Sequence, residues 1–274
     1  MHTSALGDSG GSATWFVILG RAGLAARGAV YFVVGGLAAM AGLGIGGGKV
    51  VDQQQAVRAI GNSPLGESAL WLVGGGLVAY ALWRFAQVLA LGGSSDEDSR
   101  KLSKRAIALV SGLAYAGLAS TALAQAAGRS SGGSGSSGQE SGAALLLNQP
   151  FGRWLVAAVG FAVIGAALFQ FGRAWTASFE KNLRGHELSG DQALWTRRAG
   201  RMGYAARGIA FALMGWFFLQ AALQSDASEA GGLATALRTV ASQPHGQVLL
   251  AIVGVGLALF GVYSLIESRY RRIS

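Results

Sequence analysis

The chain has 274 residues, of which 51% are hydrophobic, 13% are charged and 44 are glycine. This composition excludes an ordinary soluble domain, where charged residues make up about 25%. The net charge of +9 is compatible with an anionic partner, but the basic residues stand in clusters between long uncharged segments, so we expect a membrane surface and no nucleic acid.

Uncharged segments define the candidate membrane spans, because a bilayer core of about 30 Å needs about 20 apolar helical residues. Six such segments occur: Gly28 to Gly48, Ser68 to Trp83, Ala106 to Gly128, Trp154 to Gly172, Gly208 to Ser225 and Thr239 to Ile266. They lack the alternating pattern of a membrane barrel. The sequence therefore predicts an all-α protein, a polytopic transmembrane bundle of six helices.

The distribution of lysine and arginine predicts the orientation of these spans. If the N-terminus is inside, 17 of the 22 basic residues lie on the cytoplasmic side. The opposite side then holds five: Lys49, Arg58, Arg129, Arg153 and Arg238. We expect a multi-pass protein of the inner membrane with both the N-terminus and the C-terminus in the cytoplasm.

Three prolines mark an internal repeat. Each precedes an even-numbered span. Two positions after each proline stands a glycine, ten positions after it another glycine, and nineteen positions after it an aromatic residue. The matched sets are Pro64, Gly66, Gly74 and Trp83; Pro150, Gly152, Gly160 and Phe169; and Pro244, Gly246, Gly254 and Tyr263. Such coincidence at fixed spacing is typical of repeated units.

The odd-numbered spans repeat as well. In each of them an arginine stands seven residues before a glycine, and an aromatic residue follows three later: Arg21, Gly28 and Tyr31; Arg105, Gly112 and Tyr115; and Arg201, Gly208 and Phe211. We predict three helical hairpins in a pseudo-three-fold arrangement within one membrane domain. Residues 1–92 hold an N-terminal segment and the first repeat, 93–175 the second, and 176–274 an interfacial segment and the third.

The segments before the three prolines each carry an apolar patch and are expected to form short surface helices. They read QQQAVRAIGNSPLG, ALLLNQPFG and ALRTVASQPHG. The run GRSSGGSGSSGQ before the second of them is typical of a flexible loop, because serine and glycine cannot bury a core.

These patterns resemble a bacterial membrane family of unknown function. The residues that carry the resemblance are AARG with the aromatic span after it, and ALRT and QP-x-G before an apolar span that ends in an aromatic residue and charges. The resemblance runs from about Trp15 to Tyr270, and the middle repeat departs from it with Ser111 where the others have Arg27 and Arg207. It implies three tandem two-helix repeats and a bacterial inner membrane, and no activity.

The candidate binding residues are arginines near the cytoplasmic ends of the odd spans. Arg27 lies six residues, or about 9 Å of helix, beyond Arg21, and Arg207 stands in the same relation to Arg201. A bare charge at that depth is costly, so these side chains either extend to anionic lipid phosphates or point between helices and bind an anion. Glu267, at the end of the last span, is the one acid placed to be a protein partner.

Trp15 and Trp195 begin the first and third repeats and are expected to anchor the chain at the interface. The segments around them, ATWFVILG and DQALWTRRAGRM, are expected to lie along the cytoplasmic surface as amphipathic helices. The regularly spaced glycines have a structural explanation, since small residues let membrane helices approach closely.

No residue pattern indicates catalysis, a metal site or a cofactor. Cysteine is absent, and the histidines His2, His186 and His245 are not paired at ligand spacing. We therefore expect a non-enzymatic membrane component that binds lipids, which the charge rule predicts to be anionic on the cytoplasmic side, or a membrane protein partner. A channel or transporter for a small solute is the alternative.

Overall fold

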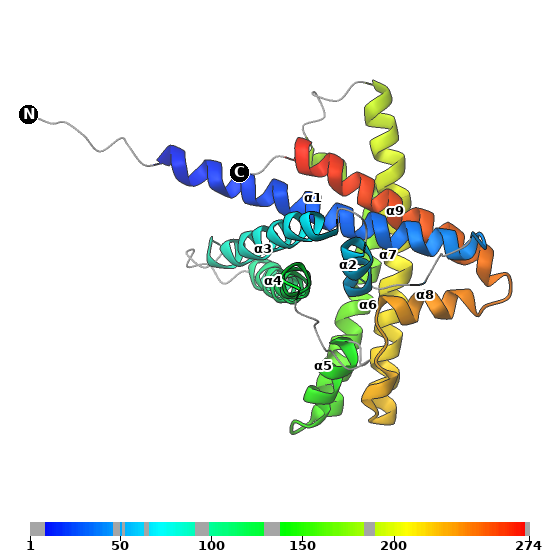
Figure 1. Cartoon of the computed structure of the whole chain (residues 1–274). Helices are drawn as coiled ribbons and strands as arrows, with labels where there is room; N and C mark the ends of the chain where they lie inside the picture. Colours follow the sequence, from blue (N-terminus) through cyan, green and yellow to red (C-terminus); the bar gives the residue numbers. More distant parts are fainter. Residues whose placement is uncertain are drawn as a thin grey trace, which may run out of the picture.

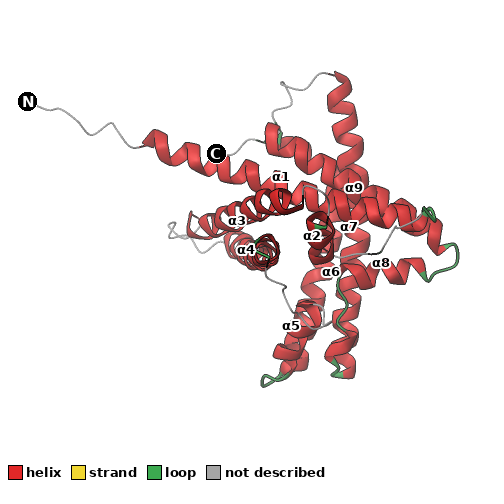
Figure 2. Ribbon diagram, in the orientation of Figure 1, coloured by secondary structure: helices red, strands yellow, loops and turns green. Residues whose placement is uncertain are grey.

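The computed structural model describes residues 9–45, 50, 53–62, 66–90, 99–128, 138–183 and 190–271. Within these residues the chain is helical apart from turns and one isolated antiparallel bridge, between Leu183 and Arg271 (Figure 2). The long helices are α1 (Ser9–Gly42), α3 (Gly66–Ala90), α4 (Ser99–Ala126), α6 (Gly152–Thr176), α7 (Gly190–Gln224) and α9 (Gly246–Tyr270). The short ones are α2 (Gln53–Gly61), α5 (Gly138–Leu147), α8 (Leu233–Ala241) and the 3-10 helices η1 (Ser178–Asn182) and η3 (Ala227–Glu229).

The six long helices are all long and apolar enough to cross a membrane, which supports a multi-pass membrane protein. The second span, Gly66–Leu89, is longer than predicted at both ends. The prediction that the sixth span begins at Thr239 is wrong, since Thr239 belongs to α8 and the span begins at Gly246. The turn around Pro244 separates the two helices, because proline supplies no backbone N–H to continue α8.

The prediction of separate surface helices around Trp15 and Trp195 is also wrong. Residues 13–20 are part of α1, and residues 191–202 are part of α7, which runs without a break for 35 residues. No proline interrupts either segment, so the backbone hydrogen bonds continue into the span.

The predicted short helices before the prolines are present as α2, α5 and α8. The turn that follows is alike in the second and third repeats: Phe151 and His245, each one residue after the proline, have left-handed backbones with φ of 61° and 60°. Gly152 and Gly246 then open α6 and α9, where a Cβ atom would collide with a carbonyl oxygen of the preceding short helix. The Ser/Gly run predicted to be a loop lies, from residue 129 to 137, outside the described residues.

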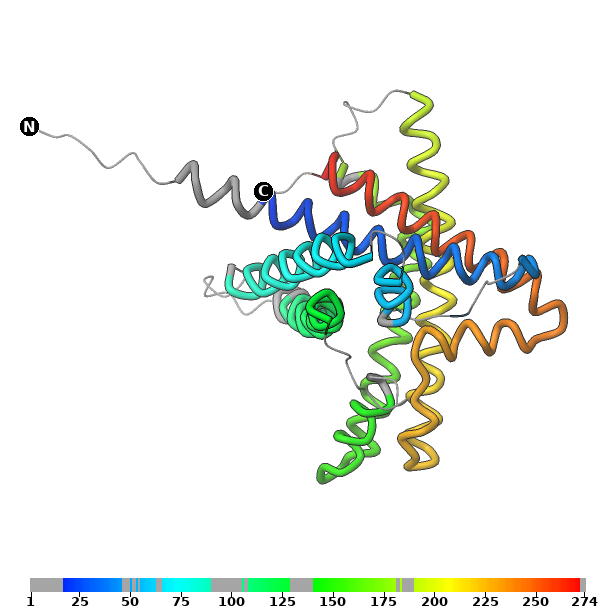
Figure 3. Tube along the Cα trace, viewed as in Figure 1, coloured from blue at the N-terminus to red at the C-terminus, as the bar shows by residue number. Residues whose placement is uncertain are grey.

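The second long helix of each repeat packs against the first long helix of the next repeat. These pairs are α3 with α4, α6 with α7, and α9 with α1, which joins the end of the chain to its beginning (Figure 1). Figure 3 shows the last pair as the orange-red and blue tubes lying along one another. The repeats therefore follow one another in a closed cyclic order.

The three junctions also share one register. The glycine ten residues after each proline meets the same position of the next helix: Gly74 meets Leu123, Gly160 meets Leu219, and Gly254 meets Ala39. A glycine in the first long helix of each repeat also meets an equivalent residue, which stands 21 positions after a proline. Gly112 meets Phe85, Gly208 meets Phe171, and Gly28 meets Leu265. Small residues at these crossings let the helices approach closely.

Packing inside a repeat is not the same in all three. In the first and third repeats Gly23 meets Tyr80 and Gly203 meets Phe260, so α1 packs on α3 and α7 on α9. In the described part of the middle repeat, α4 and α6 do not form such an interface. The position of Gly23 and Gly203 is Ile107 in the sequence of the middle repeat. The pseudo-three-fold arrangement is accordingly not confirmed, although the junctions between repeats are equivalent.

Candidate anion-binding site

Arg27 lies inside the first candidate span and is 7% exposed. The close α1–α9 junction around Gly28 brings its guanidinium group against the end of α9. One terminal nitrogen donates to Tyr80 Oη at 3.2 Å, and the other donates to Ser264 Oγ at 3.2 Å and to Glu267 Oε2 at 3.0 Å. The charge of Arg27 is thus neutralised inside the protein, as expected for an ionisable residue within a span.

Glu267 is the one buried carboxylate in the described part of the chain, with 1% exposure. Its second oxygen accepts a hydrogen bond from Arg271 Nη1 at 2.8 Å, one helical turn further along α9. Two arginines therefore use both oxygens of Glu267.

A second arginine reaches the same group of residues from α3. Arg84 donates to Tyr80 Oη at 2.8 Å and to Gln87 Oε1 at 3.1 Å. Tyr80 therefore accepts hydrogen bonds from Arg27 and Arg84 and links the two cations through one neutral oxygen. Tyr80, Trp83 and Tyr115 pack around this link with ring centroids 4.5 to 5.6 Å apart.

Arg207 has the position in α7 that Arg27 has in α1, but different partners. Its guanidinium carbon lies 4.5 Å from the ring centroid of Phe260 and 5.2 Å from that of Tyr31. It pairs with no carboxylate in the described part of the chain, and its buried Nε has no hydrogen-bond partner there. Arg207 is held by the faces of aromatic rings.

The reason for this difference is visible in the register of the repeats. Ser264 and Glu267, the partners of Arg27, stand 20 and 23 residues after Pro244; the same positions after Pro150 are Gln170 and Arg173. Arg173 lies 4.3 Å from the ring centroid of Tyr204, three residues before Arg207 on α7. At the α6–α7 junction a second cation has replaced the carboxylate.

We refer to Arg27, Arg84, Arg173, Arg207 and Arg271, with Glu267, as the arginine cluster. Its members are joined by hydrogen bonds and by the rings of Tyr80, Tyr204, Phe260 and Trp83. The cluster has five guanidinium groups and one buried carboxylate, which in the described residues pairs with Arg27 and Arg271, so the cluster itself carries an excess of positive charge.

The repeats that carry this cluster match a known family. The model of the Domain of Unknown Function (DUF1206) matches three segments of the chain, residues 22–91, 106–177 and 202–271. The chain belongs to the DUF1206 family. Each matched segment holds a first long helix, a short helix and a second long helix, which confirms the three two-helix repeats predicted from the sequence.

A bacterial protein is similar over nearly its whole length. The "Uncharacterized protein YxxB" of Bacillus subtilis (strain 168) is 31% identical over 260 residues, which cover 95% of this chain and 93% of that protein. No solved structure matches the chain. The DUF1206 family thus supports the fold and the repeat number, and it assigns no activity.

The other predicted basic candidates are Arg21 and Arg201. Each lies one residue before a segment that the DUF1206 model matches. Arg201 donates from Nε to the carbonyl oxygen of Ala174 at 3.1 Å and from Nη2 to that of Trp175 at 2.7 Å. Arg105, its equivalent, donates to the carbonyl of Val88 at 3.4 Å. These arginines cap the C-terminal ends of α6 and α3, a stabilising placement for a cation. Arg21 makes no such bond, and its buried Nε has no partner in the described residues.

The two predicted tryptophan anchors lie on the extended first parts of α1 and α7. Trp195 is 66% exposed, and Arg198 lies 5.5 Å from the centroid of its ring. Trp15 belongs to α1, and its side chain is outside the described set. The interfacial role of both residues stays a prediction.

Sequence reasoning missed several residues of the arginine cluster and one hydrogen-bond partner of Arg27. Arg84 and Ser264 share one repeat position, 20 residues after the proline, and Arg271 stands four residues after Glu267 on one helical face. Comparison of the repeats could have found the first two, and helical spacing the third. The contact of Tyr80 with Arg27 requires the packing of α1 on α3, which the sequence does not state.

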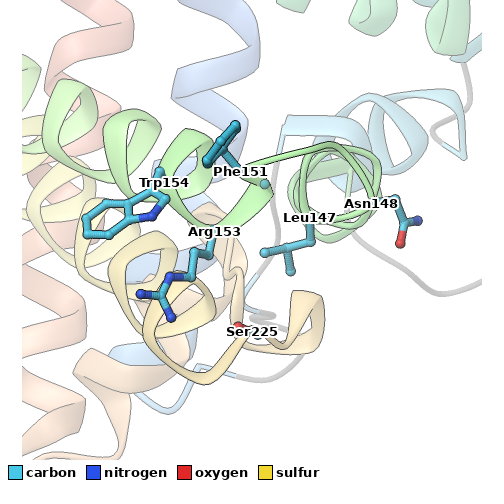
Figure 4. Close-up of a pocket in the computed structure, with 7 residues that line it drawn as sticks. Leu147, Asn148, Phe151, Arg153, Trp154 and Ser225 are labelled. Carbon is cyan, nitrogen blue, oxygen red and sulfur yellow. The ribbon is translucent and has the colours of Figure 1, made fainter.

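Two surface pockets are lined by residues other than those of the arginine cluster. One, of about 470 Å³, is at the opposite end of the α6–α7 pair, where Arg153 stacks on Trp154 near Leu147, Asn148, Phe151 and Ser225 (Figure 4). The other, of about 320 Å³, lies between η1 and the start of α7. In the described residues no three His, Asp or Glu side chains come together as metal ligands.

Proposed function

We propose that this chain is a non-enzymatic component of the bacterial inner membrane that binds anionic lipid at its cytoplasmic end. The observation that carries the proposal is the arginine cluster, which has five guanidinium groups and one buried carboxylate, paired with Arg27 and Arg271. Such an excess of positive charge between spans needs anionic partners, and lipid phosphate is the anion at hand.

The antiparallel packing of consecutive helices supports the same reading. The first long helix of each repeat therefore begins, and the second ends, at the same end of the molecule. The basic residues there include Arg105, Arg197, Arg198, Arg201 and Arg269. Under the positive-inside rule this end faces the cytoplasm, with both termini on that side. The anionic lipids of that leaflet are then the natural ligands.

The alternative, a pathway for a small solute, has less support in the contacts. The core residues Tyr31 of α1, Tyr204 of α7 and Phe260 of α9 are at most 4% exposed. Ring centroids of Tyr31 and Phe260 lie 5.0 Å apart in an edge-to-face contact. A continuous polar lining, which a solute pathway would use, is not formed by these residues.

Lipid retention tests the proposal. The purified full-length protein, reconstituted in nanodiscs of equal parts phosphatidylglycerol and phosphatidylcholine, is released and analysed by native mass spectrometry. We expect phosphatidylglycerol to be enriched among retained lipids, and the enrichment to fall with rising salt because surface charges are screened.

Equal retention of the two lipids at low salt would contradict the proposal. Selective retention of a co-purifying protein with no lipid preference would point instead to a membrane protein partner. A solute flux in proteoliposomes that depends on the chain would favour the transport alternative.

A further inference from the structure

We propose that Arg84 and Arg271, which both lie over the ring of Trp83, bind a phosphomonoester group where α3 and α9 end. This inference rests on the proposed function. It assigns anion binding to two residues of the arginine cluster and narrows the anion to a phosphate that carries two negative charges. That group is either part of a lipid headgroup or free in solution.

The indole ring of Trp83 brings the two arginines together. The guanidinium carbon of Arg84 lies 5.3 Å from the ring centroid, and that of Arg271, just after α9, lies 5.1 Å from it. A ring face stabilises a cation and leaves N–H groups at the edges of the guanidinium for other partners. The Arg271 side chain is 24% exposed and Arg84 is partly buried, so an anion can reach both from outside the bundle.

Arg84 pairs with no carboxylate in the described part of the chain. Its Nε and Nη2 donate to Tyr80 Oη at 3.2 and 2.8 Å, and its Nη1 donates to Gln87 Oε1 at 3.1 Å. These bonds use three of the five N–H groups of the guanidinium, and both acceptors are neutral. Arg84 lies within the candidate span Gly66–Leu89, where a charge without a counter-charge is costly. An anion from outside the chain would supply that counter-charge.

The charge of the connected groups indicates the class of anion. Tyr80 accepts hydrogen bonds from Arg84 and Arg27, and Glu267 accepts from Arg27 and Arg271. Three guanidinium groups and one carboxylate leave a surplus of two positive charges in this network. A phosphomonoester carries about −1.5 to −2 at pH 7 and presents three strong acceptor oxygens, whereas a phosphodiester carries a single charge. The monoester therefore matches the surplus, and its oxygens suit the planar donors of arginine.

Comparison of the repeats shows which internal counter-charge is missing on α3. The position 23 residues after the proline is Glu267 on α9 and Gln87 on α3. On α9 this carboxylate pairs with Arg27 and Arg271. On α3 the amide oxygen of Gln87 already accepts a hydrogen bond from Arg84, but it brings no negative charge. One change at Gln87 can therefore supply the counter-charge from within the protein.

The decisive variant is Gln87→Glu, examined by native mass spectrometry from nanodiscs of phosphatidic acid, phosphatidylglycerol and phosphatidylcholine in equal parts. We expect the parent to retain phosphatidic acid, a phosphomonoester, above phosphatidylglycerol, a phosphodiester. The new carboxylate should neutralise Arg84, raise the melting temperature of the ligand-free protein, and weaken phosphatidic acid binding at least about ten-fold, as for the loss of one charge-assisted hydrogen bond. Gln192→Glu is the matched control, because it makes the same charge change on an exposed glutamine at the start of α7. That control should bind within about two-fold of the parent, since an exposed charge contributes little.

Titration of the parent with inorganic phosphate and with short-chain phosphatidic acid, followed by melting temperature, separates the two sources. A response to inorganic phosphate assigns the site to the free anion, a response to the lipid only assigns it to a headgroup, and a response to neither overturns the site. A parent that retains phosphatidylglycerol over phosphatidylcholine, but phosphatidic acid no better, overturns the site and leaves the proposed function standing. The same holds if Gln87→Glu retains phosphatidic acid as Gln192→Glu does. Equal retention of all three lipids by the parent overturns both. If Gln87→Glu does not yield folded protein, Arg84→Gln decides by the same limits, since glutamine is the residue that α6 has at that repeat position, Gln170.

Discussion

The two equivalent arginines should differ sharply in what they contribute to stability. Arg27→Leu removes one partner of a buried ion pair, a change that typically costs about 3–5 kcal/mol. Tyr80 keeps its bond from Arg84, and Glu267 keeps its bond from Arg271. We therefore expect the lower end of that range, about 3 kcal/mol. Arg207→Leu removes cation–ring contacts but no ion pair, so we expect about 0–1 kcal/mol.

Unfolding in mixed micelles with increasing sodium dodecyl sulfate, followed by tryptophan fluorescence, measures both free energies of unfolding. The double variant Arg27→Leu with Glu267→Leu completes a mutant cycle. Because it removes both charges of the pair, its cost should fall below the sum of the single costs by about 1–3 kcal/mol. Equal effects of Arg27→Leu and Arg207→Leu, or a purely additive cycle, would refute the pairing as the reason for the difference.

Three further predictions follow from the packing and the charge distribution. A reporter fused after Ser274 should be cytoplasmic and one inserted between Ser130 and Gly138 should lie outside; reversed accessibility of either would contradict the orientation. Gly35→Leu should destabilise the chain by at least about 1–3 kcal/mol because its Cβ would meet the backbone of α9, whereas Gly36→Leu, with open space around it, should be neutral in the same unfolding assay. Arg201→Ala should lower the free energy of unfolding by about 1 kcal/mol through loss of the α6 cap, and an unchanged value would show that the cap is not stabilising.

Hydropathy and repeat spacing predicted the number of spans and the repeat unit, because both depend on local sequence. The charge-free segments located the six helices, and the prolines with their glycines gave the register that the structure repeats at Gly74, Gly160 and Gly254. The limits of helices were predicted less well. A helix continues as long as its backbone bonds are made, and nothing in the residues before Gly28 and Gly208 stops it.

Which helices lie together was not predictable from one chain. The repeat alone suggests that both helices of a hairpin pack, yet the strongest interfaces join one repeat to the next. The middle repeat, which is the exception, also differs in sequence: Val110 stands where the other two repeats have Ala26 and Ala206, and it is 66% exposed. In the candidate site, Glu267 was identified as the acid near the arginines. It pairs with Arg27 and not with Arg207 because α9 packs against α1, the first helix of the chain.

The three junctions use one backbone register and three different sets of charges. Glu267 pairs with Arg27 at the α9–α1 junction. By repeat position, Gln87 and Ser111 stand in place of this pair at the α3–α4 junction, and Arg173 and Arg207 at the α6–α7 junction. A carrier that moved a solute by a symmetric change would need matched polar groups at all three, since each junction would have to open and close alike. One junction closed by a buried ion pair, with different side chains at the matching positions of the other two, instead favours a rigid scaffold.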